Sequence, residues 1–357
     1  MSSAPEKKFM KGNEAVGYGA IAAGVKCYFG YPITPQNEIP EFLSAELPKI
    51  GGQFLQAESE LAASNMLLGA VAAGVRAFTS SSSPGISLMQ ETISYMAGSE
   101  LPAVFVNMNR GGPGLGDIGS SQGDYYQSTR GGGHGDYRLL VLAPSGCQEA
   151  HDMMIQAFDL AFKYRNPVMV HGDGVVGAMK EPVTLWRPES INNYDAENWR
   201  ANGIRNHGGE KRLVKSLFLA EGSLAAQNRR LQEKYKAMQA EARAETFMVD
   251  DAELIVVAFG SIGRIAKSAV RTIRAQGGKV GLVRPITLYP FPSDVLLNLA
   301  KQGKRFITVE HNAGQMVDDV RLAIRGFGDS DFHGHMPGDV PATDDFIAPI
   351  EDALRAC

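Results

Sequence analysis

Polar side chains suited to binding a small anionic ligand occur at the ends of several short apolar runs. One such segment, YFGYPITPQNEIP (28–40), places Thr34 between two prolines. Proline fixes its own φ and keeps the preceding residue extended, so we expect Thr34 in a rigid turn at a strand end. Ligands bind at such ends in open parallel sheets. A plain strand-to-helix connection, with Thr34 or Asn37 as the helix cap, explains the segment equally well.

Two glutamates, Glu58 and Glu60, lie where a predicted strand turns into an apolar helix. The helix dipole stabilises an acid at this position by about 0.3–1 kcal/mol, which accounts for one of the two. Glu60 is followed directly by Leu61, Ala62 and Ala63. It is therefore the better candidate for a buried acid that handles a proton.

Hydroxyls and a guanidinium follow two further strands. TSSSSPGIS (79–87) carries four consecutive serines, and NRGGPGLGDIGSSQGDYYQ (109–127) carries Arg110. Arg110 could bind a carboxylate through two N–H groups, and Gln122, Asp124 and His134 follow it. Ten glycines occupy the stretch from 110 to 136. The ordinary alternatives are a helix-capping serine run and a solvated arginine.

Two further glycine patterns do not predict nucleotide or metal binding. Gly114, Gly116 and Gly119 form a G-x-G-x-x-G, with Asp136 at the distance of a ribose-binding acid, but no apolar helix opens after it. GDG at 172–174 precedes an asparagine pair at 192–193, a shorter spacing than thiamine diphosphate enzymes use for Mg²⁺. We expect a strand end with a turn there, and no metal ligands in this chain.

The elements that must position these residues alternate between strands and helices. Apolar runs at 25–30, 52–57, 75–80, 103–108, 138–143 and 167–172 predict strands, and the segments between them have helical periodicity. Strand–helix repetition with nearly unbroken apolar strands predicts an α/β fold around a parallel sheet covered on both faces.

The alternation stops near residue 182 and resumes after 250. A polar stretch and a segment rich in helix formers lie between, which predicts a linker with a long solvated helix at 183–250. Strand and helix patterns then return from 254 onwards. We therefore divide the chain into a first domain (1–182), the linker, and a smaller α/β domain (251–357).

Composition narrows the class of protein. The chain has 357 residues, 44% of them hydrophobic, and 35 basic against 39 acidic residues give a net charge of −4. This charge offers no argument for nucleic-acid binding. The three cysteines (27, 147 and 357) are scattered, as in a reducing cytoplasm. We expect a cytoplasmic protein without signal peptide or membrane insertion, since the longest apolar run (61–75) is too short to span a bilayer.

Taken in order, the motifs resemble the alpha subunit of 2-oxoacid:ferredoxin oxidoreductases, of the 2-oxoglutarate or 2-oxoisovalerate type. They are YPITP (31–35), ESELAA (58–63), SSSPG (81–85), RGGPGLG (110–116), QGD (122–124), GGGHGDYR (131–138) and VEHNAGQM (309–316). The resemblance implies a domain of the type that binds the pyrimidine of thiamine diphosphate. It also implies that the smaller domain is similar to the transketolase C-terminal domain.

The resemblance also assigns roles to residues. Glu60 matches the catalytic glutamate that hydrogen-bonds N1′ of the aminopyrimidine, where a carboxylic acid favours the imino tautomer. Thr34 and Arg110 match substrate contacts. The residues expected to line the thiamine diphosphate site are Tyr31, Pro32, Ile33, Glu60, Ser83, Gly85, Gln122 and Asp124.

The same resemblance implies partners and a reaction. Mg²⁺, the diphosphate half-site and a [4Fe–4S] cluster are expected on a separate beta subunit, with a gamma subunit and ferredoxin completing the system. The implied reaction is oxidative decarboxylation of a 2-oxoacid to acyl-CoA with reduction of ferredoxin, CoA being a co-substrate. His134 slightly favours 2-oxoglutarate over 2-oxoisovalerate. A nucleotide-binding dehydrogenase and a non-catalytic scaffold are the alternatives.

Overall fold

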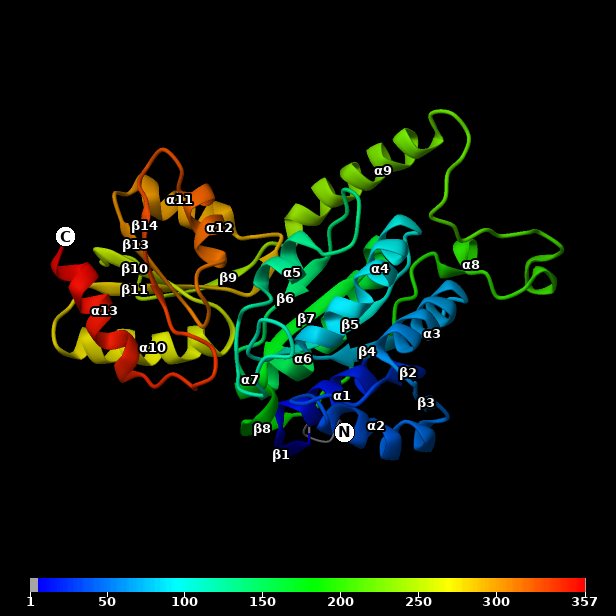
Figure 1. The fold of residues 1–357 in the computed structure, drawn as a ribbon, viewed down its shortest axis with the longest axis horizontal. Coiled ribbons are helices and arrows are strands. Elements are labelled where there is room, and N and C mark those ends of the chain that lie inside the picture. The colour runs from blue at the N-terminus through cyan, green and yellow to red at the C-terminus, as the bar shows by residue number, and fades with distance from the viewer. Residues whose placement is uncertain (1–5, 357) are drawn as a thin grey trace.

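A seven-stranded sheet forms the centre of the first domain. The computed structural model describes residues 6–356. The strands of this sheet are β2 (Cys27–Gly30), β3 (Gln53–Gln56), β4 (Ala77–Ser81), β5 (Val104–Asn109), β6 (Leu140–Leu142), β7 (Val168–Asp173) and β12 (Thr287–Tyr289). Their order is β12-β6-β7-β5-β4-β2-β3 (Figure 1). All pairings are parallel except that of β12 with β6. The six strands predicted for this domain, β2 to β7, are thereby confirmed.

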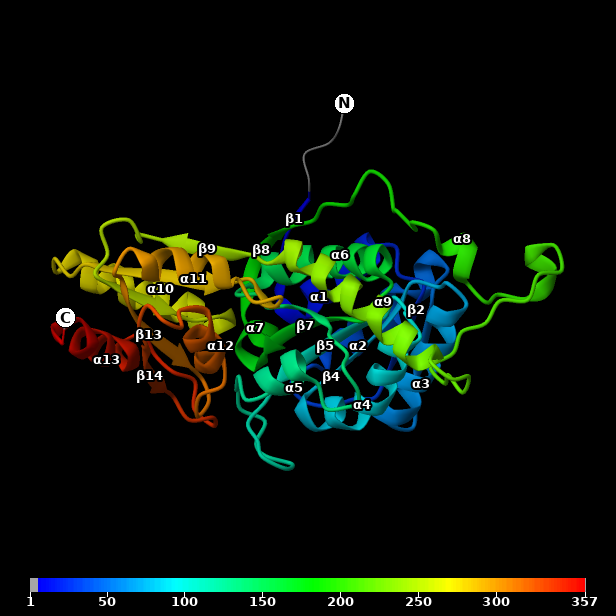
Figure 2. The same cartoon turned by 90° about the horizontal axis from the view of Figure 1, so that it is seen from above.

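Helices cover both faces of this sheet, as its central strands require. β4, β5 and β7 are buried along their whole length, and such strands occur where both faces are covered. The helices are α1 (Gly12–Ala22), α2 (Glu38–Glu46), α3 (Glu60–Ala72), α4 (Ser83–Gly98), α5 (Tyr125–Arg130), α6 (Cys147–Tyr164) and α7 (Gly174–Ala178). Figure 2 shows α1 and α6 on one face, with α4 and α5 on the other.

A five-stranded sheet forms the smaller domain. It consists of β9 (Ala244–Phe247), β10 (Leu254–Val257), β11 (Val280–Pro285), β13 (Arg305–Glu310) and β14 (Ser330–Gly334). The order is β14-β13-β10-β11-β9, with only β9 antiparallel. Four helices flank it in Figure 1: α10 (Gly260–Ala275), α11 (Ser293–Lys301), α12 (Met316–Ala323) and α13 (Asp344–Arg355). Within residues 6–356 no helix is long and apolar enough to cross a membrane.

The segment between the domains contains the long helix expected there, α9 (Ser223–Met238), and a short helix, α8 (Ala196–Trp199). The expectation that α9 is solvated is only partly right. Leu231, Tyr235 and Met238 are buried against the first domain, and Lys234 forms an ion pair with the buried Glu100 at 3.4 Å. The polar composition of this segment concealed the apolar stripe, which is narrow because only one face of the helix is buried.

Strand pairing also links segments that are distant in sequence. β1 (Lys7–Lys11) and β8 (Lys180–Thr184) form a separate antiparallel pair. β9 lies within 183–250 but pairs with β11 of the smaller domain. β12 lies within 251–357 but completes the first sheet. Three short 3₁₀ helices complete the list of elements, at Pro48–Ile50, Ile204–His207 and Gln239–Glu241.

One of the two clusters of buried apolar side chains extends across both domains, and the other lies within the smaller domain. A continuous cluster of buried side chains extends from the first sheet into the face of the smaller domain that carries α11 and α12. At the junction the rings of Tyr125 and Phe259 lie 5.6 Å apart, and Met316 is fully buried. The domains are therefore packed together rather than loosely tethered.

Candidate functional site

The carboxyl ends of three neighbouring strands bring most of the predicted site residues together. β5, β4 and β2 are adjacent in the sheet. They lead into Arg110, the serines at 81–83, and the YPITP turn, respectively. Glu60 begins α3 after β3, at the next position in the sheet. This is the edge at which ligands bind in open parallel sheets.

Glu60 is the buried member of the glutamate pair. It is the first residue of α3, and the hydroxyl of Ser59 caps the helix by accepting from the Ala62 N–H at 3.1 Å. Glu60 is 7% exposed, whereas Glu58 is exposed. Glu60 is thus both the acid at the start of the helix and the buried acid. Among residues 6–356, the Glu60 carboxylate has neither a hydrogen-bond nor an ion-pair partner.

A glycine at the start of α4 leaves room for the Glu60 side chain. A Cβ atom at Gly85 would lie 2.7 Å from Glu60 Oε1 and would overlap the Ser81 hydroxyl. Alanine would therefore displace one of these two side chains. The close approach explains why glycine is found in the first turn of α4, where it is otherwise a poor helix former.

Arg110 is buried and held against the YPITP turn. Its guanidinium donates to the carbonyl oxygens of Thr34 at 3.1 Å and Leu115 at 2.9 Å. Its backbone N–H donates to the Ser83 hydroxyl at 3.0 Å. The structure thus brings Thr34, Ser83 and Arg110 together. The contact to Thr34 is through its backbone, while the Thr34 hydroxyl accepts from Asn37 at 3.3 Å.

Asp124 joins this group through a buried asparagine. Asn107 donates to Asp124 Oδ2 at 2.8 Å and accepts from the Ser83 N–H at 3.2 Å. Burial raises the pKa of the Asp124 carboxyl, and hydrogen bonds from Ser83 and Asn107 oppose this effect. A carboxyl group in these surroundings can carry a proton more readily than one in water.

Two buried amides that the sequence analysis missed hold the YPITP turn. Asn13 donates to the Pro35 carbonyl at 2.8 Å. Gln36 donates to the Tyr31 carbonyl at 3.3 Å and accepts from Ser80 at 2.6 Å. Within the turn, Tyr31 and Pro32 are exposed and Ile33 is half-buried. No motif marked Asn13 or Gln36, although Gln36 follows the second proline directly.

Gln122 lies apart from this cluster. Its side chain donates to the Phe259 carbonyl at 2.9 Å and accepts from the His311 N–H at 3.2 Å, both in the smaller domain. The amide is thus already bonded at both ends. The sequence places Gln122 two residues before Asp124 but gave no sign that its side chain would bond to the smaller domain.

His134 is also remote from Arg110. It is exposed, its carbonyl accepts from Ser94, and it lines a cavity of about 550 Å³ between α4 and α9. Ser94 is eleven residues beyond Ser83 on the same helix, a separation of roughly 16 Å. The argument for 2-oxoglutarate from His134 therefore has no geometric support.

The G-x-G-x-x-G at 114–119 and the GDG at 172–174 serve local structure. After Gly119 no helix begins until Tyr125. Gly116 has φ 65°, and a side chain there would also overlap the Gly111 carbonyl. Asp173 ends β7, caps α7 by accepting from the Val176 N–H at 3.0 Å, and accepts from Ser261 at 2.5 Å. Neither pattern presents a dinucleotide-binding turn.

Several buried polar atoms at and beyond the carboxyl ends of β4 and β5 have no partner among residues 6–356. They are Ser81 Oγ, Ser82 Oγ, Ser120 Oγ and Arg110 Nε. Buried polar atoms in proteins are nearly always hydrogen-bonded. These atoms, with Ser81 beside the unpaired Glu60 carboxylate, fit polar ligands: an aminopyrimidine has both donors and acceptors, and an oxoacid anion has acceptors. The donor set therefore fits half of a thiamine diphosphate site.

Comparison with known proteins places this chain in a family with a thiamine diphosphate-binding domain. Residues 18–250 match the thiamine diphosphate-binding family of pyruvate flavodoxin/ferredoxin oxidoreductases, and residues 252–346 match core domain II of pyruvate:ferredoxin oxidoreductases. The chain belongs to the 2-oxoacid:ferredoxin oxidoreductase family, whose members are enzymes acting with partner subunits.

Curated relatives are similar over nearly the whole chain. The ketoisovalerate oxidoreductase subunit VorB of Methanothermobacter thermautotrophicus is 50% identical, over 97% of both chains. The 2-oxoglutarate synthase subunit KorA of Methanocaldococcus jannaschii is 38% identical, over 89% of this chain and 92% of its own. Both names belong to this one family.

Solved structures agree with the fold. The 2-oxoglutarate:ferredoxin oxidoreductase of Magnetococcus marinus superposes with a TM-score of 0.86 at 26% identity, covering 98% of this chain and 66% of that one. A split-gene transketolase superposes with a TM-score of 0.60 at 13% identity, covering 97% of this chain and 98% of that one. The second match supports the transketolase-like architecture alone. The fold predicted from the sequence is confirmed.

Proposed function

We propose that this chain supplies the aminopyrimidine and oxoacid half of the active site in a CoA-dependent 2-oxoacid:ferredoxin oxidoreductase. The observation that carries the proposal is the buried, unpartnered carboxylate of Glu60, with Gly85 and Ser81 against it. Glu60 would hold a proton at N1′ of the pyrimidine. When bound, thiamine diphosphate supplies the electron sink for decarboxylation.

Substrate binding is assigned to the Arg110 group. The Arg110 guanidinium already donates to two carbonyls, and its Nε is buried without a partner among residues 6–356. A carboxylate is the ligand that such a donor set favours. Thr34 and Ser83 flank it, and Asp124 orients Ser83 through Asn107.

For the substrate we infer 2-oxoisovalerate in place of the 2-oxoglutarate favoured by the sequence. Two VorB proteins named for ketoisovalerate are 50% and 49% identical to this chain, whereas the KorA proteins of 2-oxoglutarate synthases are 32–38% identical. His134, the one residue that suggested a distal carboxylate, lies near the other end of α4. A branched aliphatic oxoacid needs no second cationic contact.

The remaining parts of the enzyme are assigned to other subunits. Mg²⁺, the diphosphate and a [4Fe–4S] cluster would be held by a beta subunit, with a gamma subunit and ferredoxin completing electron transfer in the cytoplasm. In residues 6–356, Cys27 and Cys147 are free, and no group of three His, Cys, Asp or Glu side chains is arranged around a metal position.

The test uses the enzyme assembled with its partner subunits. Glu60→Gln keeps the shape of the side chain but changes its acid–base chemistry, so turnover with CoA and a viologen acceptor is expected to fall at least a hundredfold. Glu58→Gln is the matched control, because that side chain is exposed. Near-normal turnover in Glu60→Gln would refute the role of Glu60.

The same assay decides the substrate. We expect kcat/KM to be higher for 2-oxoisovalerate than for 2-oxoglutarate in the unaltered enzyme. The reverse order would overturn the substrate assignment and leave the role of Glu60 standing. Stabilisation of the chain by NAD(H) in the absence of thiamine diphosphate would instead favour the dehydrogenase alternative.

A further inference from the structure

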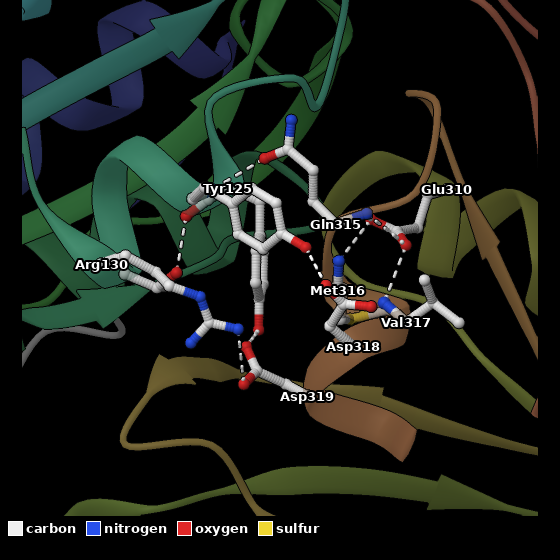
Figure 3. A network of polar contacts seen from close by, with 10 residues as sticks. Tyr125, Arg130, Glu310, Gln315, Met316, Val317, Asp318 and Asp319 are labelled. Carbon is white, nitrogen blue, oxygen red and sulfur yellow. Dashed lines mark hydrogen bonds and ion pairs between the residues drawn. The ribbon is translucent and has the colours of Figure 1, made fainter. Parts of the chain in front are cut away.

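A side chain of the smaller domain holds the backbone on both sides of Asp124. Gln315 Nε2 donates to the Gly123 carbonyl at 2.7 Å, and Gln315 Oε1 accepts from the Tyr126 N–H at 2.8 Å. Figure 3 shows the Gln315 side chain directed at this segment. One primary amide therefore fixes the chain before and after Asp124, and its two bonds match the donor and acceptor that only an amide offers together.

Gln315 is itself held by a buried carboxylate. Glu310, at the end of β13, accepts from the backbone N–H groups of Gln315 at 3.2 Å, Met316 at 2.8 Å and Val317 at 3.0 Å. These groups form the amino end of α12, where free N–H groups and the helix dipole favour an anion (Figure 3). The loop that projects Gln315 is thus rigid before it meets the first domain.

Further contacts continue along α5. Tyr125 donates to Asp319 at 2.6 Å, Arg130 pairs with Asp319 at 3.1 Å, and Tyr126 donates to Asp318. These bonds orient α5 beyond the segment that carries Asp124. Together with the bonds of Gln315, they join the smaller domain to Gly123, Tyr125, Tyr126 and Arg130. Asn312 and His311 also bond the backbone of Gln122, so Gln315 is the contact on both sides of Asp124.

From Asp124 a chain of buried hydrogen bonds leads to Arg110. Asp124 accepts from Asn107, Asn107 accepts from the Ser83 N–H, and the Ser83 hydroxyl accepts from the Arg110 N–H. Each link is 2.8–3.2 Å long. Displacing Asp124 therefore leaves buried polar groups without partners, a cost that favours keeping all links in place together.

We propose that Gln315 is a positioning residue through which the smaller domain sets the geometry of the Arg110 substrate site. This inference rests on the proposed function, because it takes Arg110 as the ligand of the oxoacid carboxylate. Glu60 follows a different strand and is not a member of this chain of bonds. Loss of the Gln315 contacts should therefore act on substrate binding more than on turnover.

The first experiment tests the contact itself in the full-length chain alone. Gln315→Met keeps the length of the side chain and removes both hydrogen bonds. We expect hydrogen–deuterium exchange of a peptide covering 122–130 to accelerate about tenfold. Gln302→Met is the matched control, since Gln302 is exposed in the same domain. Unchanged exchange in Gln315→Met would overturn the proposal without bearing on the function.

The second experiment measures kinetics in the assembled enzyme. Gln315→Met is expected to raise KM for the 2-oxoacid about tenfold, with kcat changed less than twofold and a melting temperature equal to that of Gln302→Met. Gln315→Glu keeps the acceptor for the Tyr126 N–H but sets a carboxylate oxygen against the Gly123 carbonyl, so KM should rise at least as much as in Gln315→Met. Faster exchange with unchanged KM would overturn the positioning role, as would a fall in kcat alone.

Discussion

Glu58 and Glu60 are two residues apart, yet one faces solvent and the other is buried. Ser59 is extended and caps α3, so the chain changes from strand to helix between them. Only Glu60 therefore lies in the interior, where the Gly85 backbone and the Ser81 hydroxyl are its neighbours.

Arg110 offers a test of substrate binding at the level of one side chain. Arg110→Lys keeps the charge but replaces a planar guanidinium, which can donate two parallel hydrogen bonds, by a compact ammonium group. KM for the 2-oxoacid should therefore rise about 10- to 100-fold. Arg110→Ala should raise it further. Steady-state kinetics of the assembled enzyme provide the measurement, with the exposed Arg229→Lys as control. An unchanged KM would remove Arg110 from the substrate site.

His171 makes stability depend on pH. Burial lowers its pKa from 6.5 to about 3. Between these values the unfolded chain binds a proton that the folded chain does not, so the stability contributed at neutral pH is lost as the pH falls below about 6.5. Between pH 7 and pH 5, protonation of this residue in the unfolded chain should lower the free energy of unfolding by about 2 kcal/mol.

Urea unfolding at the two pH values measures this effect. His171→Asn should lose less stability than the unaltered chain between pH 7 and pH 5, by about 2 kcal/mol. His134→Gln, a change at an exposed histidine, should behave like the unaltered chain. Equal losses in His171→Asn and the unaltered chain would show that His171 does not titrate as described.

At the scale of elements, the start of α4 matters most for the site. Gly85→Ala would put a methyl group 2.7 Å from Glu60 Oε1 and onto Ser81 Oγ. Turnover of the assembled enzyme should fall more than tenfold because Glu60 is displaced, although alanine is the better helix former by about 1 kcal/mol. Unaltered kcat would show that Glu60 need not keep its place beside Gly85.

Gly69→Ala is the matched control for that substitution. Gly69 lies inside α3, and no atom comes within 4 Å of the position of an added Cβ. Without a clash, only the helix propensity should count, and the free energy of unfolding should rise by about 0.5–1 kcal/mol with activity unchanged.

The strands of the first sheet could be predicted, but its first helix could not. β5 and β7 each begin with three consecutive apolar residues, a pattern typical of buried parallel strands. α1 has the sequence GNEAVGYGAIA, in which three glycines conceal the helical period. Those glycines are required by close packing, because a Cβ at Gly12 would overlap the Val176 carbonyl and one at Gly19 would overlap the His151 carbonyl.

At the scale of the whole molecule, the second domain completes the first. A fragment ending at residue 250 would lose β12 and leave the edge of β6 open, while β9 would lose its partner β11. Open strand edges pair with other chains. We expect this fragment to aggregate or to melt at least 5 °C below the full chain, by size-exclusion chromatography and thermal unfolding. A monodisperse fragment as stable as the full chain would contradict this.

Residues of the proposed site could be recognised in the sequence only where a local pattern marked them. Glu60 and Arg110 stand out against apolar or glycine-rich neighbours. Asn13, Gln36 and Gln315 are ordinary amides whose partners lie far away in the sequence or on backbone atoms. Such roles depend on tertiary contacts that one sequence does not encode in any periodic form. The position of His134, beside Ser94 in the second half of α4, likewise depends on tertiary contacts.

β12 has a consequence for how such a chain can change in evolution and in the laboratory. Only three residues long, it ties the C-terminal third of the polypeptide into the sheet of the N-terminal half. Recombination near residue 250, where the sequence pattern marks a domain boundary, would exchange the smaller domain together with β12, a strand of the first sheet. Gene fusions and chimaeras of this family should therefore tolerate junctions outside residues 6–356 better than a junction between the two domains.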